Sequence, residues 1–433
     1  PPMPTPEPIT PSAAVAAPAE PANVYRHAGF VSFLIARVVA VVATQVQAVV
    51  VAWQVYDLTR EPIALAYVGL AQFLPMLVLL LPAGDLIDRY SRKPILTAAW
   101  GLSAACAVAL WWLAGHGTAG VAGIYAVLVV FGCARAFSAP ALQSLLPQIV
   151  PREQLAQALA ANSMLLRMAS IGGPFLGGLL YAAGGGGLTY AVCAVSLTLA
   201  TVLMLRVPVA RTVLLAATGT IWQRFGAGIH FIRTRPIILG TISLDLFAVL
   251  LGGVVALLPV YAHEVLKVGP AGLGALRSAM ALGEVVTGFY LAARPFDRHV
   301  GRRMFWAVAV FGVANLVFSL SHWFWLSLAA LAVAGAADMV SMYIRGALVQ
   351  FSTPDSMRGR VNAVNMLFIG SSNELGEFRA GTSAAWLGVV PAAIVGGLCT
   401  LGVVGGWMLA FQTLRQVDRF EEAAQATGAA PSP

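Results

Sequence analysis

Apolar runs of about 20 residues follow one another along almost the whole chain, and each is long enough to cross the hydrocarbon core of a membrane. Twelve such runs lie near 28–56, 62–83, 95–114, 120–147, 154–182, 188–207, 236–262, 270–293, 303–320, 323–349, 361–387 and 389–414. The 433 residues are 59% hydrophobic and only 10% charged, whereas a soluble globular domain carries about 25% charged residues. A surface so poor in charge cannot face water, so we predict an all-α polytopic membrane protein with twelve transmembrane helices.

Basic residues are distributed unevenly between the loops that join these runs. With both termini placed in the cytoplasm, eighteen of the 26 Lys and Arg residues fall on the inner side, and only Arg60 and Lys267 fall on the outer side. Because cytoplasmic loops carry the excess of basic residues, we expect a multi-pass protein of the cell inner (cytoplasmic) membrane with both termini cytoplasmic. The basic residues form short scattered groups rather than one stripe, so we expect no nucleic-acid partner.

The longest polar interruption separates the sixth apolar run from the seventh and divides the chain into two six-helix bundles. The predicted parts are a disordered cytoplasmic tail 1–25, an N-terminal bundle 26–207, a cytoplasmic linker 208–235, a C-terminal bundle 236–415 and a cytoplasmic tail 416–433. Within the linker, apolar residues recur at helical spacing, namely Trp222, Phe225, Ile229 and Ile232. They predict an amphipathic helix that either lies on the inner leaflet or packs against the loops.

The two halves resemble each other in one loop. Asp88–Lys93 follows the second apolar run, and the similarly charged Asp297–Arg303 follows the eighth. An internal repeat of six spans is typical of two-lobed, pseudo-symmetric carriers that work by alternating access.

The first of these loops carries a family motif. Gly84–Leu96 resembles the motif G-x-L-x-D-R-x-G-R-K-x-x-L of the major facilitator superfamily and departs from it at Ser91. Gly84 permits two helices to approach closely, and Asp88 can accept hydrogen bonds from the N-terminus of a facing helix. The resemblance implies a conformational latch that holds the two lobes outward-facing, formed by Gly84, Asp88, Arg89, Arg92 and Lys93. Simple anchoring of the loop by its positive charge is the alternative.

The fifth apolar run contains a second motif. Ala169–Gly178 resembles the exporter motif G-x-x-x-G-P-x-x-G-G of the same superfamily, with Ala169 in place of the first glycine. The small residues permit close helix contact, and the proline predicts a bend. The residues of this exporter-type bend are Gly173, Pro174, Gly177 and Gly178. The motif favours export over uptake, and a Gly/Pro-rich packing face is the alternative.

Two further stretches, Gly132–Ala141 and Ser371–Gly381, resemble the enterobactin-exporter branch of the superfamily.

Ionisable residues occur inside the predicted spans. They are Arg37, Arg135, Arg167, Asp245, Arg277, Glu284, Asp338, Arg345, Glu374, Glu377 and Arg379. Each costs about 2.5–3.5 kcal/mol near the centre of an isolated helix, so they must pair with one another or line a wet cavity. The N-terminal half holds only arginines of this set, whereas the C-terminal half holds all of its acids.

In the superfamily, spans one, four, seven and ten line the central cavity, and four of these charges fall on them. We expect Arg37 and Arg135 to bind an anionic or phenolic group of the substrate. Asp245 and Asp338 are our first candidates for proton coupling, because a carboxyl group removed from water binds protons nearer neutral pH.

The remaining intramembrane acids, Glu284, Glu374 and Glu377, are the reserve candidates for proton coupling, on spans that more often support the cavity than line it. Asp338 has Arg345 on its own helix face, and Asp245 is expected to meet Arg37 or Arg135 across the cavity. A structural ion pair is the alternative role for each of these charges.

The chain has no nucleotide-binding signature and no catalytic constellation, so we expect no enzyme activity, no cofactor and no metal site. The four cysteines lie inside apolar runs and are expected to be packing residues. The sequence therefore predicts a monomeric secondary exporter of a small hydrophobic, aromatic or anionic compound, siderophore-like or drug-like, in exchange for protons. A flippase for lysophospholipids or similar lipids is the alternative, and a non-transporting membrane sensor is a remote one.

Overall fold

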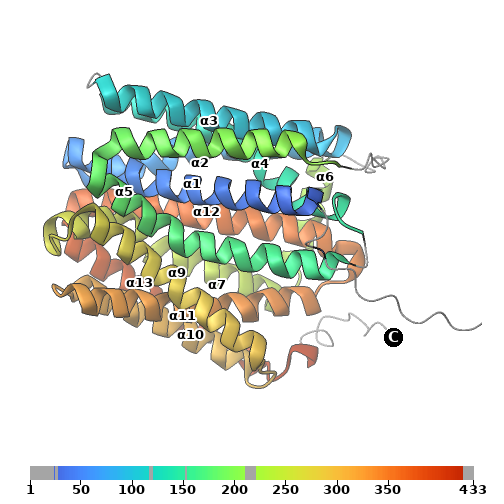
Figure 1. Ribbon diagram of the computed structural model, residues 1–433. Helices are drawn as coiled ribbons and strands as arrows, with labels where there is room; N and C mark the ends of the chain where they lie inside the picture. The colour runs from blue at the N-terminus through green and yellow to red at the C-terminus, as the bar shows by residue number, and fades with distance from the viewer. Residues whose placement is uncertain (1–23, 25–27, 117–119, 152–153, 210–220, 423–433) are drawn as a thin grey trace, which may run out of the picture.

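The computed structural model describes residues 24, 28–116, 120–151, 154–209 and 221–422, and within these ranges the chain forms helices and short connections (Figure 1). The first half contains α1 (Ala28–Thr59), α2 (Pro62–Arg89), α3 (Arg92–His116), α4 (Val121–Leu145), the 3-10 turn η2 (Leu146–Gln148) and α5 (Leu155–Arg206). The second half contains α7 (Pro236–Gly252), the 3-10 turn η4 (Val255–Leu257), α8 (Leu258–Val260), the π-helical turn η5 (Tyr261–Val265), α9 (Gly269–Ala293), α10 (Val300–Leu320), α11 (Phe324–Phe351), α12 (Asp355–Leu387), α13 (Val389–Ala410) and α14 (Gln412–Gln416). Between them lies α6 (Ile221–Arg233). The predicted tail 1–25, apart from Val24, and the end of the predicted C-terminal tail at 423–433 lie outside the described residues.

Nine helices of the described residues are long and apolar enough to cross a membrane. One of the nine is α5, which reverses direction at Gly184 and Gly185, where Gly185 has a φ of 64° that favours glycine. The helices α9 and α12 are not among the nine, although both are long, because ionisable residues interrupt their apolar character. Counting both legs of α5 and adding these two helices gives twelve spans, and that number remains our interpretation.

The helices run side by side, with α6 at one end of the bundle and the α1–α2 turn at the other (Figure 1). We call the end opposite α6 the distal end. A core of buried side chains from α1 to α5 fills the first half, and a second core from α7 to α14 fills the other half. A third cluster, which includes Val49 and Trp53 of α1 and Leu257 and Tyr261 of the second half, joins the two halves near the distal end.

The apolar face of α6 lies against the protein. Ile232 is buried in a cluster with Ile238 of α7 and Val361 of α12, and Phe225 and Ile229 pack against the same cluster. This contact agrees with the packing alternative for the predicted amphipathic helix. The side chains of Ile221–Arg224, including Trp222, lie outside the described part of the chain.

Candidate functional site

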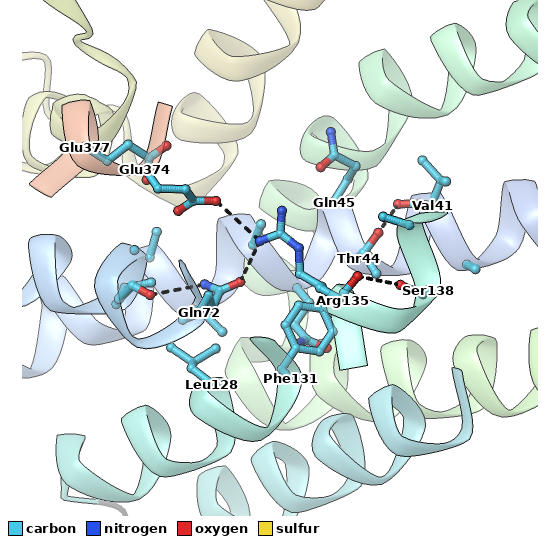
Figure 2. Close-up of a pocket in the computed structure, with 18 of the residues that line it drawn as sticks. Val41, Thr44, Gln45, Gln72, Leu128, Phe131, Arg135, Ser138, Glu374 and Glu377 are labelled. Carbon is cyan, nitrogen blue, oxygen red and sulfur yellow. Dashed lines mark hydrogen bonds and ion pairs between the residues drawn. The ribbon is translucent and has the colours of Figure 1, made fainter. Parts of the chain in front are cut away.

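A cavity of about 440 Å³ lies between the two halves (Figure 2). Helices α1, α2 and α4 supply most of its wall, and α9 and α12 supply its charged side chains from the second half. Its polar and aromatic lining includes Thr44, Gln45, Gln47, Gln72, Trp100, Phe131, Arg135, Ser138, Arg277, Glu374 and Glu377. The cavity thus combines flat apolar surface with a few charged and amide groups, as small-molecule sites usually do.

The centre of the polar wall is Arg135 of α4. Its Nη1 lies 3.5 Å from Oε1 of Glu374, which belongs to α12 of the other half, and 3.4 Å from Oε1 of Gln72 (Figure 2). Gly132, one turn before Arg135, lets α4 approach α2 so closely that a Cβ there would overlap the Gln72 carbonyl. The glycine therefore brings Arg135 and Gln72 together.

Glu374 and Glu377 are three residues apart on one face of α12, so both carboxyl groups point the same way. An oxygen of each lies 3.6 Å from the position of a Cβ on Gly69 of α2. Glu377 also interacts electrostatically with Arg277 of α9. We call Arg135, Arg277, Glu374 and Glu377 the cavity cluster, in which two arginines face two glutamates.

A second group of charges lies between α5, α7, α9 and α11. Arg345 of α11 binds Asp245 of α7, and its Nη2 lies 3.6 Å from Oδ1 of Asp338. Arg167 of α5 lies 3.4 Å from Oε2 of Glu284 on α9, and Glu284 is close enough to Asp338 for mutual repulsion. We call these five residues the α9–α11 cluster, in which two arginines face three carboxyl groups.

Close helix packing holds the α9–α11 cluster together. A Cβ on Gly283 would overlap the Ala332 carbonyl, and a Cβ on Gly335 would overlap the Met280 carbonyl. Because Gly283 precedes Glu284 and Gly335 lies one turn before Asp338, this backbone contact brings the two carboxyl groups together.

The structure corrects one expectation about pairing and one about the cavity wall. Asp245 binds Arg345 rather than Arg37 or Arg135, because it faces α11 inside its own half. Arg37 faces α5, where its Nη1 donates a 2.8 Å hydrogen bond to Asn162, and it is not among the residues that line the cavity.

A third correction concerns the reserve acids of α12. Glu374 and Glu377 line the cavity, whereas Asp245 and Asp338 are not part of its lining. The expected pairing of Asp338 with Arg345 is present.

The glycines of the exporter-type motif pack in two directions. Gly173 and Gly177 contact α1, since a Cβ on them would lie 2.6 Å from the Gln45 Cβ and 3.1 Å from the Val46 Cα. Gly178 contacts α9 of the other half, where a Cβ on it would overlap the Pro270 carbonyl. Pro174 lies within the first leg of α5.

The loop predicted to be the latch follows α2. Arg89 pairs with Asp85 at 2.9 Å, and Lys93 donates hydrogen bonds of 2.9 and 2.7 Å to the carbonyls of Leu205 and Val207, at the end of α5. Gly84 lies in the last turns of α2, and Arg92 is the first residue of α3. The Asp88 side chain lies outside the described part of the chain.

Two groups of polar residues in the structure are not among the candidates that the sequence predicts. The first consists of Gln45, Gln47 and Gln72, whose amides interrupt apolar runs and were a usable signal. The second is Tyr56, His263 and Glu264 at the distal end, where the Tyr56 hydroxyl donates to the Glu264 carboxylate. Nothing in the sequence marks that second group, because its residues lie 208 positions apart.

Comparison with known proteins agrees with this architecture. A profile of the family described as transmembrane secretion effector, within the major facilitator superfamily, matches residues 19–432. The chain is similar to the enterobactin exporter EntS of Citrobacter koseri, with 25% identity over 409 residues that cover 94% of this chain and 96% of that protein. It is also similar to the enterobactin exporter EntS of Escherichia coli O1:K1 / APEC, with 24% identity over 92% of this chain and 94% of that protein.

Two solved structures share the fold. A bacterial homologue of the iron transporter ferroportin in an inward-facing state has a TM-score of 0.70 and 17% identity, over 91% of this chain and 100% of that one. A bacterial homologue of the human lysosomal transporter Spinster in an inward-facing and occupied conformation has a TM-score of 0.68 and 15% identity, over 95% of this chain and 99% of that one. Because the family profile covers nearly the whole sequence, the chain belongs to the transmembrane secretion effector family of the major facilitator superfamily and is a multi-pass membrane transporter of small molecules.

Proposed function

We propose that the protein exports a small hydrophobic, aromatic or anionic compound from the cytoplasm in exchange for protons. The observation that carries this proposal is the pair formed by Arg135 and Glu374 at the wall of the cavity. It places an anion-binding group of one half beside an acid of the other, where a substrate can compete for the guanidinium. The similarity to proteins named enterobactin exporters supports a siderophore-like substrate.

The cavity cluster is suited to bind an anion. Its two arginines and two glutamates balance in charge, so a substrate anion that takes the place of Glu374 beside Arg135 favours protonation of that glutamate, which restores the balance. Phe131 and Trp100 offer aromatic surface in the same cavity. An aromatic acid or phenolate therefore matches both parts of the wall.

The α9–α11 cluster is suited to hold a proton. It has three carboxyl groups for two arginines, so one negative charge is left without a positive partner when all are ionised. An unbalanced charge in the membrane interior is costly, and binding one proton removes it. Glu284 and Asp338, which repel each other, are the acids that gain most from sharing that proton.

This proton site is linked to the movement of the halves through Arg167. It belongs to the first half, whereas its partner Glu284 belongs to the second. Protonation of Glu284 weakens the bond between the halves, and deprotonation restores it. A proton can therefore bias the conformational equilibrium, which is what coupled exchange requires.

The buried cluster that joins the two halves near the distal end obstructs that side, which suits a state that receives substrate from the α6 side. With the predicted topology that side is the cytoplasm, as export requires, and we place the exporter in the cytoplasmic membrane as a monomer. The proposed route leads from the cytoplasm, past Arg135, to the distal surface.

The test starts with a deletion strain grown with and without iron, and with metabolite profiles of its cytoplasm and medium. Accumulation of one aromatic or anionic compound inside the cells is expected. Purified protein in proteoliposomes should then move this compound against its gradient when a proton gradient is imposed, and the Asp338→Asn protein should not. Unchanged metabolite profiles together with lost lipid remodelling would instead support the lipid flippase.

A further inference from the structure

The cavity extends from the cavity cluster into the first half, where α1, α3 and α4 form its wall. Helix α3 packs against α4 and contributes the side chain of Trp100, which is 5% exposed and belongs to the buried core of this half. The cavity therefore continues between the helices of one half. We call this part of it the side pocket, and its lining consists of Ala40, Thr44, Gln47, Trp100, Leu128 and Phe131.

Gln47 of α1 brings an unused hydrogen-bond acceptor to the side pocket. The residue is only 2% exposed, and no described residue donates a hydrogen bond to its Oε1. Gln54, two turns further along α1, shows the usual situation, because its Oε1 accepts a 2.7 Å hydrogen bond from the Tyr190 hydroxyl. Buried acceptors without a partner are rare and unfavourable. Oε1 of Gln47 is therefore available to a donor that enters the cavity.

The remaining lining of the side pocket suits a flat ring. Ala40, Thr44 and Ala48 recur at every fourth position of α1 and line the cavity, so their small side chains form one stripe along the helix. Phe131 and Trp100 are 6% and 5% exposed and contribute aromatic surface to the same wall. Small residues leave space, and aromatic side chains pack well against another ring.

Helix α4 connects the side pocket to the arginine of the cavity cluster. Leu128, Phe131 and Arg135 follow one another at helical spacing, so they lie on one face of α4 (Figure 2). Phe131 and Arg135 are one turn apart, which is a distance of about 5.4 Å along the helix axis. A ring that packs against Phe131 can therefore carry an acidic group to Arg135.

We propose that the side pocket binds the aromatic ring of the substrate and that Gln47 selects rings that carry a hydroxyl group. The acidic group binds Arg135, the ring lies against Phe131 and Trp100, and the ring hydroxyl donates to Oε1 of Gln47. The proposal rests on the proposed function, because it uses the same cavity and the same arginine. It narrows the substrate class to hydroxyaryl acids and makes Gln47 a specificity-determining residue.

The selection follows from the cost of leaving the Gln47 oxygen unpaired. Before the substrate binds, a water molecule in the cavity can donate to this oxygen. A ring with a hydroxyl group replaces that hydrogen bond, whereas a ring without one displaces the water and leaves the acceptor alone. A site of this kind discriminates against the analogue that lacks the hydroxyl group more strongly than an apolar pocket does.

The test compares three acids that differ at one ring position, namely 3-hydroxybenzoate, 3-methoxybenzoate and benzoate. Isothermal titration of the purified protein in detergent gives a Kd for each. We expect 3-hydroxybenzoate to bind about three- to tenfold more tightly than the other two, the change that one hydrogen bond to a neutral group allows. The methoxy group fills more space than the hydroxyl group and accepts but does not donate, so it separates hydrogen bonding from contact area.

Gln47→Met keeps the length of the side chain and removes the amide. The three acids should then bind with Kd values within about twofold of one another, because no acceptor is left to reward the hydroxyl group. The melting temperature of the ligand-free variant should stay the same or rise, since Gln47 loses no hydrogen bond to a described residue. A purely structural role of Gln47 would lower the melting temperature and leave the preference for 3-hydroxybenzoate in place.

The matched control is Gln54→Met, the same substitution on the same helix. It removes the hydrogen bond from Tyr190, so it should lower the melting temperature and keep the preference for 3-hydroxybenzoate. Equal binding of the three acids by the wild-type protein, or an undiminished preference in Gln47→Met, would overturn the proposal. If benzoate still binds in a manner that depends on Arg135, the proposed function survives that result. Failure of all three acids to bind would count against both.

Discussion

Arg135 of α4 and Glu374 of α12 form an ion pair between the two halves of the protein, with 3.5 Å between Nη1 and Oε1. Each side chain is contributed by a different half of the chain, so the pair exists only while these helices stay close. A substrate anion that binds the guanidinium breaks the same contact. Binding and movement of the halves are therefore linked at one position.

We expect Arg135→Ala to weaken binding of an anionic substrate more than binding of its neutral analogue. A hydrogen bond to a charged group contributes about 1.5–3 kcal/mol, so the difference should be roughly ten- to a hundredfold in Kd. Arg135→Lys should restore only part of it, since an ammonium group lacks the planar fork. Isothermal titration with both ligands measures this, and equal losses for the two would show that Arg135 has a structural role.

A double variant separates the structural part of this effect. Arg135→Ala alone leaves Glu374 without its partner and should lower the melting temperature. Arg135→Ala with Glu374→Gln removes the unpaired charge and should recover most of the loss. Anion binding should remain weak in the double variant.

Asp338→Asn should abolish uphill transport while substrate binding stays within about twofold of wild type, because the carboxyl groups of the α9–α11 cluster do not line the cavity. Glu284→Gln should have the same effect, as it shares the proposed proton. Asp245→Asn, at the buried end of the cluster, should reduce coupling as well. If all three variants still concentrate substrate in proteoliposomes, coupling belongs to Glu374 and Glu377 or to an ion other than the proton.

Arg345→Met should destabilise the protein strongly. The side chains of Arg345 and Asp245 are only 12% and 11% exposed, and Asp338 also forms an ion pair with this arginine. Removing one partner of a buried ion pair costs about 3–5 kcal/mol. Thermal unfolding in detergent measures the effect, and combination with Asp245→Asn should reverse part of it.

Lys93→Met should mainly reduce stability, whereas Asp88→Asn should mainly slow transport. Lys93 donates two hydrogen bonds to carbonyls at the end of α5, so its loss should reduce stability by about 1–2 kcal/mol. Asp88→Asn should leave stability unchanged and slow transport, because the amide keeps the shape and loses the charge that a helix N-terminus attracts. Full transport by the Asp88→Asn protein would reduce the loop to an anchor.

Single cysteines should report the orientation. His230 on α6 and His322 at the distal end are both exposed and lie at opposite ends of the bundle. An impermeant maleimide should label His322→Cys in intact cells and His230→Cys only in inside-out vesicles. The reverse pattern would contradict the predicted topology.

The sequence predicts the helices of this protein well because the membrane imposes a length and an apolar character on each of them. Runs near 28–56 and 303–320 correspond to α1 and α10. The loop between the fifth and sixth runs was also expected, and the structure makes that turn with only Gly184 and Gly185 outside helical geometry.

The partners of the intramembrane charges were predicted less well. Spacing along one helix identifies pairs such as Asp338 and Arg345, because seven residues complete two turns. It contains no information on contacts between helices far apart in the chain. The sequence therefore matches Asp245 with the wrong arginine and ranks Glu374 behind the aspartates, although Glu374 faces the cavity.

The contact of Gly178 on α5 with Gly274 on α9 has a consequence for the speed of the transport cycle. Each glycine presents bare backbone to the other helix, and a Cβ on Gly274 would lie only 3.2 Å from the Gly178 Cα. Separating two such surfaces requires no change of side-chain rotamer and exposes little apolar surface. This contact therefore adds little to the energy barrier of the transport cycle. Resistance to parting the halves then comes from other contacts between them, such as the buried packing of Trp53 against Leu257 and the Arg135–Glu374 pair, and substitutions there can change the turnover rate without altering the glycine contact.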